Sequence, residues 1–137
     1  MRITGAKAHK ARLKRIRGPE MVREVGKAIF VASDLLKVEA QISITEGAVS
    51  GKNHVPSTAP NPPNNDTGHL ANGIENHKTG PLTAETSSNA EYAAAHEFGN
   101  SRLPARPYMA PAAAKTRPKA EKLVVAAVKR VVNGGTL

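Results

Sequence analysis

One long apolar stripe limits the folds open to this chain more than any other feature. Pro19 follows Gly18 and suits the first position of a helix, where its missing N–H costs nothing. From there apolar residues recur at helical spacing until Gly47, which predicts one helix over about 19–45. Such a helix extends about 40 Å, which is long for a small domain, so one end is expected to lie against something else. The stripe consists of Met21, Val25, Ala28, Ala32, Leu35 and Ile42, flanked by Val22, Ile29 and Leu36, and the opposite face holds Arg23, Glu24, Lys27, Asp34, Lys37 and Gln41.

The core around that helix is expected to be aliphatic. The 137 residues suit one domain, and 39% of them are hydrophobic but only 3% aromatic, with no Trp. The absence of cysteine excludes disulfides, thiolate zinc sites and cysteine nucleophiles. No apolar run approaches the roughly 20 residues that span a membrane, and the basic start lacks the apolar segment of a signal peptide. We therefore expect a protein of a reducing cytoplasm, or of a particle assembled there, with no membrane partner.

The rest of the chain predicts an α+β fold, with the long helix packed on a small antiparallel sheet. Residues 47–66 hold four prolines and four asparagines without periodicity. They predict an extended loop that orders against a neighbour, the alternative being a mobile surface insertion. Residues 67–76 and 82–88 predict two short strands, joined by a turn at Gly80-Pro81.

Two further helices are expected near the C-terminus. The first is short, capped by Asn89 and stopped by Gly99. After a proline-punctuated segment, Pro111 and Pro118 are expected to break up an alanine-rich stretch, and the last helix then runs over about 118–132. The predicted organisation is a flexible basic arm over 1–18, with a nascent helix at 7–17, a single domain over 19–133, and a tail over 134–137.

The net charge of +9 is concentrated at the two ends of the sequence. Residues 1–30 carry nine Lys/Arg against two acids, residues 31–100 carry three against eight, and residues 101–137 carry eight against one. Such ends favour a polyanion or an acidic protein surface, the alternative being a solvated tail. The candidate contacts with DNA or an acidic partner are Lys7, Lys10, Arg12, Lys14, Arg15 and Arg17.

No residue pattern is typical of catalysis or of metal binding. His96-Glu97 begins like a zincin helix, but Asn100 stands where the second histidine is required. The glycines form no phosphate-binding motif, and the serines lie in no recognisable nucleophile elbow. We therefore expect no enzyme activity and no catalytic, cofactor or metal site. A small basic nucleic-acid-binding protein stays open as an alternative function, although the arm carries no aromatic residue for base stacking, and a small host or toxin-type enzyme stays open as another.

A series of short motifs between about 56 and 111 resembles a known family. In order they read PPNNDTGHL (62–70), Ile74, NAEYA (89–93), HEFG (96–99) and PARPYMAPA (104–112). This series resembles the small tail-component family of lambda-like long-tailed phages and prophages, that is, the neck or tail-completion proteins. The family pattern runs Thr-Gly-x-Leu, Tyr-Ala, Glu-Phe-Gly and Arg-Pro-Phe, and Tyr108 replaces the usual Phe. Each motif is weak alone, but four in the right order are fairly specific, and the resemblance covers about 20–132.

The resemblance implies a non-enzymatic virion protein without cofactors. It implies a homo-oligomeric, six-fold ring at the head–tail interface, which joins the capsid connector to the tail tube and leaves a channel for DNA. Its partners would be further copies of itself, adjacent connector and tail proteins, and genomic DNA through non-specific contact. Its place would be the virion neck, and the host cytoplasm during assembly. The motif residues are Thr67, Gly68, Leu70, Tyr92, Glu97, Phe98, Gly99, Arg106, Pro107 and Tyr108.

Each motif also has a structural interpretation. Gly68 suits a turn with positive φ, and Leu70 is expected to start a strand that faces the core. Tyr92 and Phe98 are expected to anchor the short helix in the core, and the Arg106 guanidinium to pair with Glu97 of the same or a neighbouring subunit. The alternative is that all these residues determine the fold and have no direct partner role.

Overall fold

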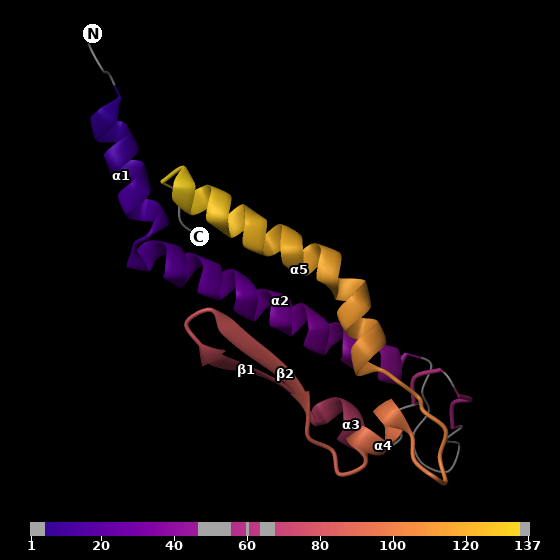
Figure 1. Ribbon diagram of the computed structural model, residues 1–137. Helices are drawn as coiled ribbons and strands as arrows, with labels where there is room; N and C mark the ends of the chain where they lie inside the picture. Colours follow the sequence, from indigo (N-terminus) through magenta and orange to yellow (C-terminus); the bar gives the residue numbers. More distant parts are fainter. Residues whose placement is uncertain (1–4, 47–55, 60, 64–67, 135–137) are drawn as a thin grey trace.

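The computed structural model describes residues 5–46, 56–59, 61–63 and 68–134, and its architecture is α+β (Figure 1). The predicted fold class, with a long helix packed against a small antiparallel sheet, is confirmed. The extended loop predicted at 47–66 falls mostly on residues outside those described. The elements in order are α1 (Ala6–Ile16), α2 (Pro19–Thr45), α3 (His69–Asn72), β1 (Ile74–Gly80), β2 (Thr83–Ser88), α4 (Ala93–Phe98) and α5 (Met109–Val132).

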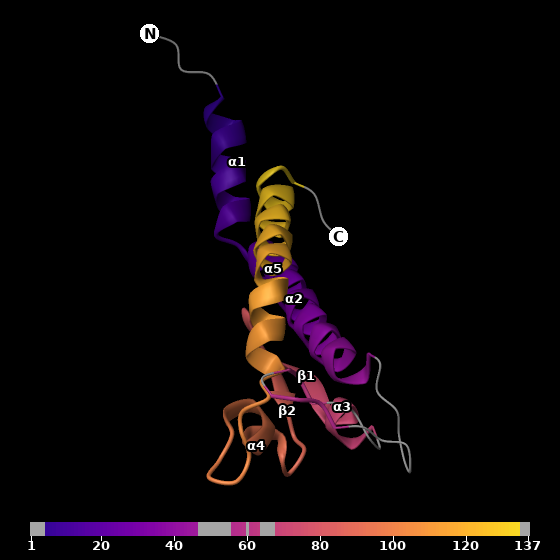
Figure 2. The same ribbon diagram turned by 90° about the vertical axis from the view of Figure 1, so that its right-hand side faces the viewer.

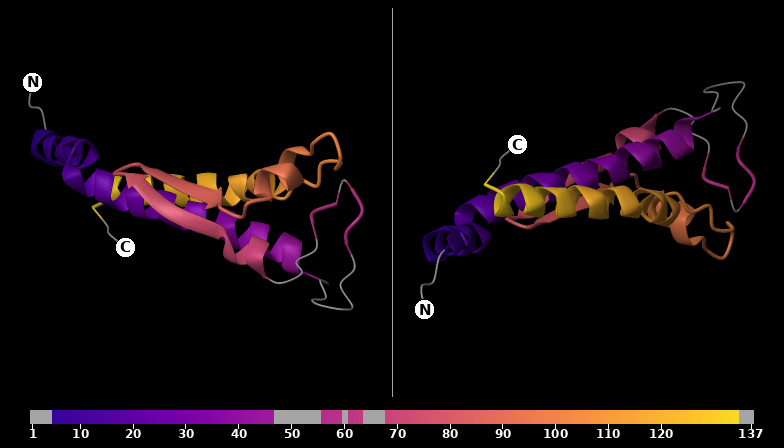
Figure 3. Two further views of the ribbon diagram at one scale, coloured as in Figure 1. Left: turned by 90° about the horizontal axis from the view of Figure 1, so that it is seen from below. Right: turned by 90° about the horizontal axis from the view of Figure 1, so that it is seen from above.

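Helix α2 is the central element, with α5 along one side and the β1–β2 hairpin along the other (Figure 3). It begins with Pro19 at its first position, as predicted. Because two neighbours cover different sides of α2, burial does not follow a single stripe. Ala28 is buried as expected, but Ile42 is 46% exposed. Glu24, predicted to face solvent, is 1% exposed and pairs with Lys27 at 3.2 Å.

The hairpin differs in its limits from the strands that the sequence predicts. Residues 69–72 are helical, so the strand prediction is wrong there, and β1 continues to Gly80 through the segment predicted as a turn. In β1 only Ile74 is buried, and polar side chains attach the hairpin to α2. The Ser33 hydroxyl donates to the Asn76 side-chain oxygen at 2.5 Å, and the Thr86 hydroxyl donates to the Ser33 carbonyl at 2.8 Å. The apolar alternation by which strands are recognised is therefore largely missing.

Helix α5 begins nine residues earlier than predicted, and both prolines lie inside it. Pro111 is its third residue, where the backbone N–H has no partner within the helix, so the ring costs little. Pro118 lies in the interior and removes one helical hydrogen bond. Figure 1 shows α5 bent in its N-terminal half, as expected for a helix with an internal proline.

The main core lies where α3, α4 and the start of α5 meet the C-terminal end of α2. It is built mostly from small aliphatic side chains, as the composition predicts, and Tyr108, 1% exposed, is its single aromatic member among the described residues. The buried members are Ala40, Ile44, Leu70, Ala71, Ile74, Ala90, Ala93, Tyr108 and Ala112.

A substitution at Gly26 tests whether the hairpin packs on α2. A Cβ at this position would lie well inside van der Waals distance of the Pro81 carbonyl oxygen. At an open helix position Gly→Ala stabilises by about 1 kcal/mol. Here we expect Gly26→Ala to lower the free energy of unfolding by about 1–3 kcal/mol, because backbone must shift to admit the methyl group. Chemical denaturation measures the change.

The control for this prediction is Asp34→Ala, at an exposed position of the same helix. We expect it to leave stability within about 0.5 kcal/mol of the parent. A Gly26→Ala protein at least as stable as the parent would mean that the hairpin turn does not pack against α2.

Candidate functional site

The motif residues that the structure describes gather at one end of the molecule, where α4 turns into α5 (Figures 1 and 2). We call residues 96–110 the α4–α5 corner. Leu70 faces the core as predicted and is 4% exposed, but it lies in helix α3, so its assignment to a strand is wrong. Gly68 has a φ of 83°, in agreement with the predicted turn, and Thr67 lies outside the described residues.

Glu97 holds the corner together by capping α5. Its carboxylate accepts hydrogen bonds from three successive backbone N–H groups, those of Tyr108 at 2.8 Å, Met109 at 2.9 Å and Ala110 at 2.9 Å. The first N–H groups of a helix have no partner within it, and a negative charge there is also favoured by the helix dipole. Sequence reasoning missed this role because the cap comes from a residue more than ten positions before the helix.

The predicted ion pair between Arg106 and Glu97 is absent within the described part of the subunit. The backbone N–H of Arg106 donates instead to the His96 carbonyl at 2.6 Å, and the Arg106 Nε is buried without a hydrogen-bond partner. A pair with Glu97 of a neighbouring subunit stays a prediction. Burial lowers the pKa of His96, and the nearby positive charge of Arg106 lowers it further.

Gly99 lets the chain leave α4 sharply, as predicted. It has a φ of 73°, and a Cβ there would lie 2.8 Å from the backbone nitrogen of Ala105. The Asn100 side chain accepts hydrogen bonds from the backbone of Arg102 at 2.9 Å and Leu103 at 2.8 Å. The segment between α4 and α5, which ends at the half-buried Pro107, is therefore tightly folded on itself.

Tyr108 joins the corner to the sheet. Its hydroxyl lies 2.6 Å from that of Ser88 at the end of β2, and its ring fills the core. Burial raises the pKa of the Tyr108 phenol, and the hydrogen bond with Ser88 opposes this. The residue that departs from the usual Phe of the family pattern thus has its own hydrogen-bond partner.

Tyr92 and Phe98 do not anchor α4 in the core, so this prediction is wrong. Tyr92 is 41% exposed and packs edge-on against the His96 ring, with 5.3 Å between centroids. Phe98 is 81% exposed. Residues six apart on a helix differ by about 240° in direction, so the two cannot face the same core. Phe98 is instead held outward between the tethered Glu97 and the constrained Gly99.

The basic candidates lie at the opposite end of the molecule, and most of them are on helix α1. The predicted nascent helix at 7–17 is a helix over Ala6–Ile16 without a buried residue. The Arg15 guanidinium donates to the Val132 carbonyl at the end of α5, at 3.1 Å. The two basic ends of the sequence therefore meet, which no local pattern indicated. Lys7, Lys10, Arg12, Lys14 and Arg17 are exposed.

Comparison with known proteins found no match: a scan of protein-family models, a search of curated proteins and a search of solved structures each returned nothing. Within the described ranges, no three His, Cys, Asp or Glu side chains are grouped so that they can hold a metal ion. Among the described helices, none combines the length and the apolar character needed to cross a bilayer.

Replacing Glu97 tests the cap. Glu97→Ala leaves three N–H groups at the start of α5 without their acceptor, and we expect it to lower the free energy of unfolding by about 2 kcal/mol. The matched control is Glu91→Ala, which removes the same charge from an exposed site near α4. Thermal denaturation compares the two. Equal effects would show that the carboxylate does not cap α5.

His96 makes stability depend on pH. Because its pKa in the folded state lies below the ordinary value of 6.5, the unfolded chain binds the proton more readily. Its contribution to stability is therefore complete at neutral pH and is lost as the pH falls below about 6.5. We expect His96→Gln to reduce the drop in melting temperature between about pH 7.5 and pH 5.

The control for the pH prediction is His9→Gln, on the exposed surface of α1. It should leave the pH dependence as in the parent protein. If His96→Gln also leaves it unchanged, the imidazole is not buried beside Arg106 in solution.

Proposed function

We propose that this chain is a non-enzymatic structural protein of a tailed-phage virion. It forms a six-fold ring at the head–tail junction, where it joins the capsid connector to the tail tube and leaves a channel for DNA. The motif series over 62–112 and its resemblance to the small tail-component family support this function. In this proposal the protein belongs to the virion neck, and to the host cytoplasm during assembly.

The exposed ring of Phe98 carries the proposal. If the motif residues only determined the fold, the aromatic residue of the Glu-Phe-Gly motif would be expected to pack inside. Phe98 is instead 81% exposed, while Glu97 and Gly99 on either side of it are each constrained. Aromatic side chains presented on a rigid backbone lose little entropy on binding and are typical anchors of protein interfaces.

A second apolar side chain of the corner is also exposed. Leu103, in the segment that follows Gly99, is 41% exposed. Exposed apolar side chains on a constrained backbone favour contact with another protein over contact with water. The α4–α5 corner is therefore proposed as a contact with an adjacent ring subunit or an adjacent neck protein.

Removing the Phe98 ring tests the proposed function. We expect Phe98→Asp to leave the melting temperature of the isolated subunit within about 2 °C of the parent, since the side chain is exposed. Loss of an interface anchor costs about 2 kcal/mol or more per contact. The yield of infectious particles from a phage or prophage carrying the change should therefore fall at least about tenfold.

The matched control is Leu82→Asp, which places the same charge on an exposed apolar residue of the hairpin turn. It should assemble as the parent does. Normal yield with Phe98→Asp would show that the corner makes no essential contact. Imaging that finds this chain as a single copy away from the tail axis would exclude the ring.

A further inference from the structure

We infer that the exposed basic face of α1, formed by Lys7, Lys10, Lys14 and Arg17, binds the phosphate backbone of duplex DNA. We call this face the basic surface. The inference depends on the charges at this end of the molecule and not on the function proposed for the α4–α5 corner. It chooses between the two partners that the charge of residues 7–17 left open, DNA and an acidic protein surface, and names the face that makes the contact.

Helix α1 carries its cations in two sets. Residues 7, 10, 14 and 17 follow each other at spacings of three, four and three, so these side chains share one face of the helix. Arg12 and Arg15 lie on another face, where they line a cleft together with Val132 and Asn133 from the end of α5. The hydrogen bond from Arg15 to Val132 holds α1 against α5. The exposed set consists of Lys7, Lys10, Lys14 and Arg17.

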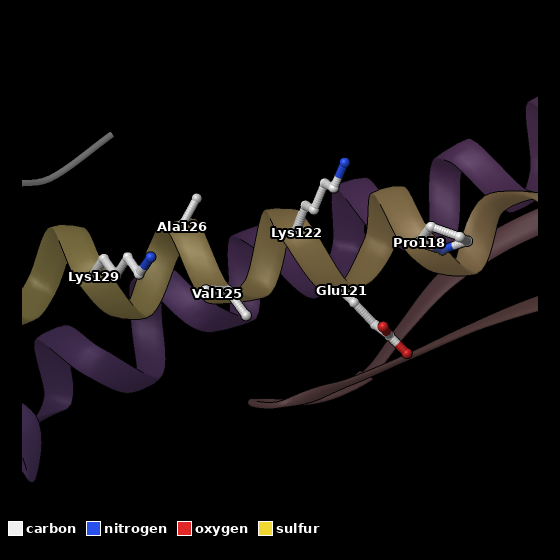
Figure 4. Close-up of a pocket in the computed structure, with 6 residues that line it drawn as sticks. All are labelled: Pro118, Glu121, Lys122, Val125, Ala126 and Lys129. Atoms are coloured by element: carbon white, nitrogen blue, oxygen red, sulfur yellow. The ribbon is translucent and has the colours of Figure 1, made fainter.

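Helix α5 adds cations whose charge is not neutralised within the described subunit. Lys115 pairs with Glu39 at 2.7 Å and Arg117 with Glu121 at 3.0 Å. In the part of the chain that the structure describes, the remaining cations of α5 have no acidic partner. Two of them, Lys122 and Lys129, lie two turns apart beside a depression on α5 that the acidic Glu121 also lines (Figure 4). The unneutralised cations of α5 are Lys119, Lys122, Lys129 and Arg130.

The concentration of positive charge is not required by packing. No residue of α1 is buried, and α1 contains no acidic residue. Glu20, at the start of α2, is the acidic residue that lines the cleft between α1 and α2. Like charges gathered in this way repel one another and destabilise the folded subunit. A bound polyanion would neutralise these charges and remove the repulsion. We therefore take charge complementarity to a polyanion as the reason why the cations are gathered on this face.

Duplex DNA fits this surface better than the other polyanions. Neither α1 nor α5 contains a Phe, Tyr or Trp residue, so the stacking platforms typical of single-strand binding are missing from these helices. The exposed set on α1 extends about 15 Å along the helix. Duplex DNA presents one negative charge about every 1.7 Å of its axis, so several phosphates can face these side chains at once.

The test compares two triple variants of the full chain that have the same net charge. One is Lys7→Gln, Lys10→Gln and Lys14→Gln on the basic surface, and the other is Lys37→Gln, Lys78→Gln and Arg102→Gln elsewhere. Binding to a short labelled duplex of arbitrary sequence is measured by fluorescence anisotropy over a range of salt concentrations. Circular dichroism confirms that both variants fold.

We expect the surface variant to bind the duplex about 100-fold more weakly than the parent at 0.1 M salt, and the control variant to bind within about threefold of it. The slope of log affinity against log salt should become shallower by roughly 0.9 for each lysine that contacts a phosphate. Arg15 is left unchanged because it attaches α1 to α5.

Three results would overturn the inference. The first is a parent chain that binds no duplex at low salt. The second is an equal loss of affinity in both triple variants, which would indicate attraction by net charge alone. The third is tighter binding of polyaspartate than of the duplex at equal charge and salt, which would identify an acidic protein surface as the partner. The readout is separate from particle assembly, so a failure here leaves the Phe98 test standing, and the converse also holds.

Discussion

The carboxylate of Glu97 determines how the two halves of this molecule are joined. It comes from the last turn of one helix and accepts hydrogen bonds from the N–H groups of the N-cap Tyr108 and of the first two residues of the next helix, α5. That arrangement fixes the point at which α5 starts and so its path along α2. It also places Tyr108 in the core and leaves Phe98 outside. One short polar interaction between nearby segments thus sets the orientation of both the buried and the exposed aromatic residue.

The elongated shape separates two surfaces of different chemistry. Apolar side chains are exposed at the α4–α5 corner, and exposed cations of α1 lie at the far end, where α1 meets the end of α5. Figure 2 shows α1 and α4 at opposite ends of the molecule. Helix α2 extends between them as a rigid spacer of 27 residues. A subunit of this kind can contact a protein at one end and a polyanion at the other without interference between the two. This division of surfaces would suit the joining role that we propose.

Several elements could be predicted because their signals are local. Pro19 and the apolar stripe after it predicted α2 within one residue at its start, and Gly99 predicted the end of α4 through its freedom to adopt positive φ. The strands were harder, since the hairpin packs through Ser33, Asn76 and Thr86 rather than through alternating apolar side chains. The start of α5 was misplaced because a proline near a helix start is tolerated where the N–H needs no partner within the helix.

By itself, the sequence determined the fold class, the aliphatic character of the core, the position of the long helix and the uneven distribution of charge. Tertiary structure alone decided which residues of a motif face inward. It buried Glu24 beside Lys27, exposed Phe98, and brought the two basic ends together through Arg15. The physical reason is range: propensity, capping by neighbours and periodicity act over one or two turns. Burial, and a hydrogen bond between residues 117 positions apart, depend on packing that no local segment specifies.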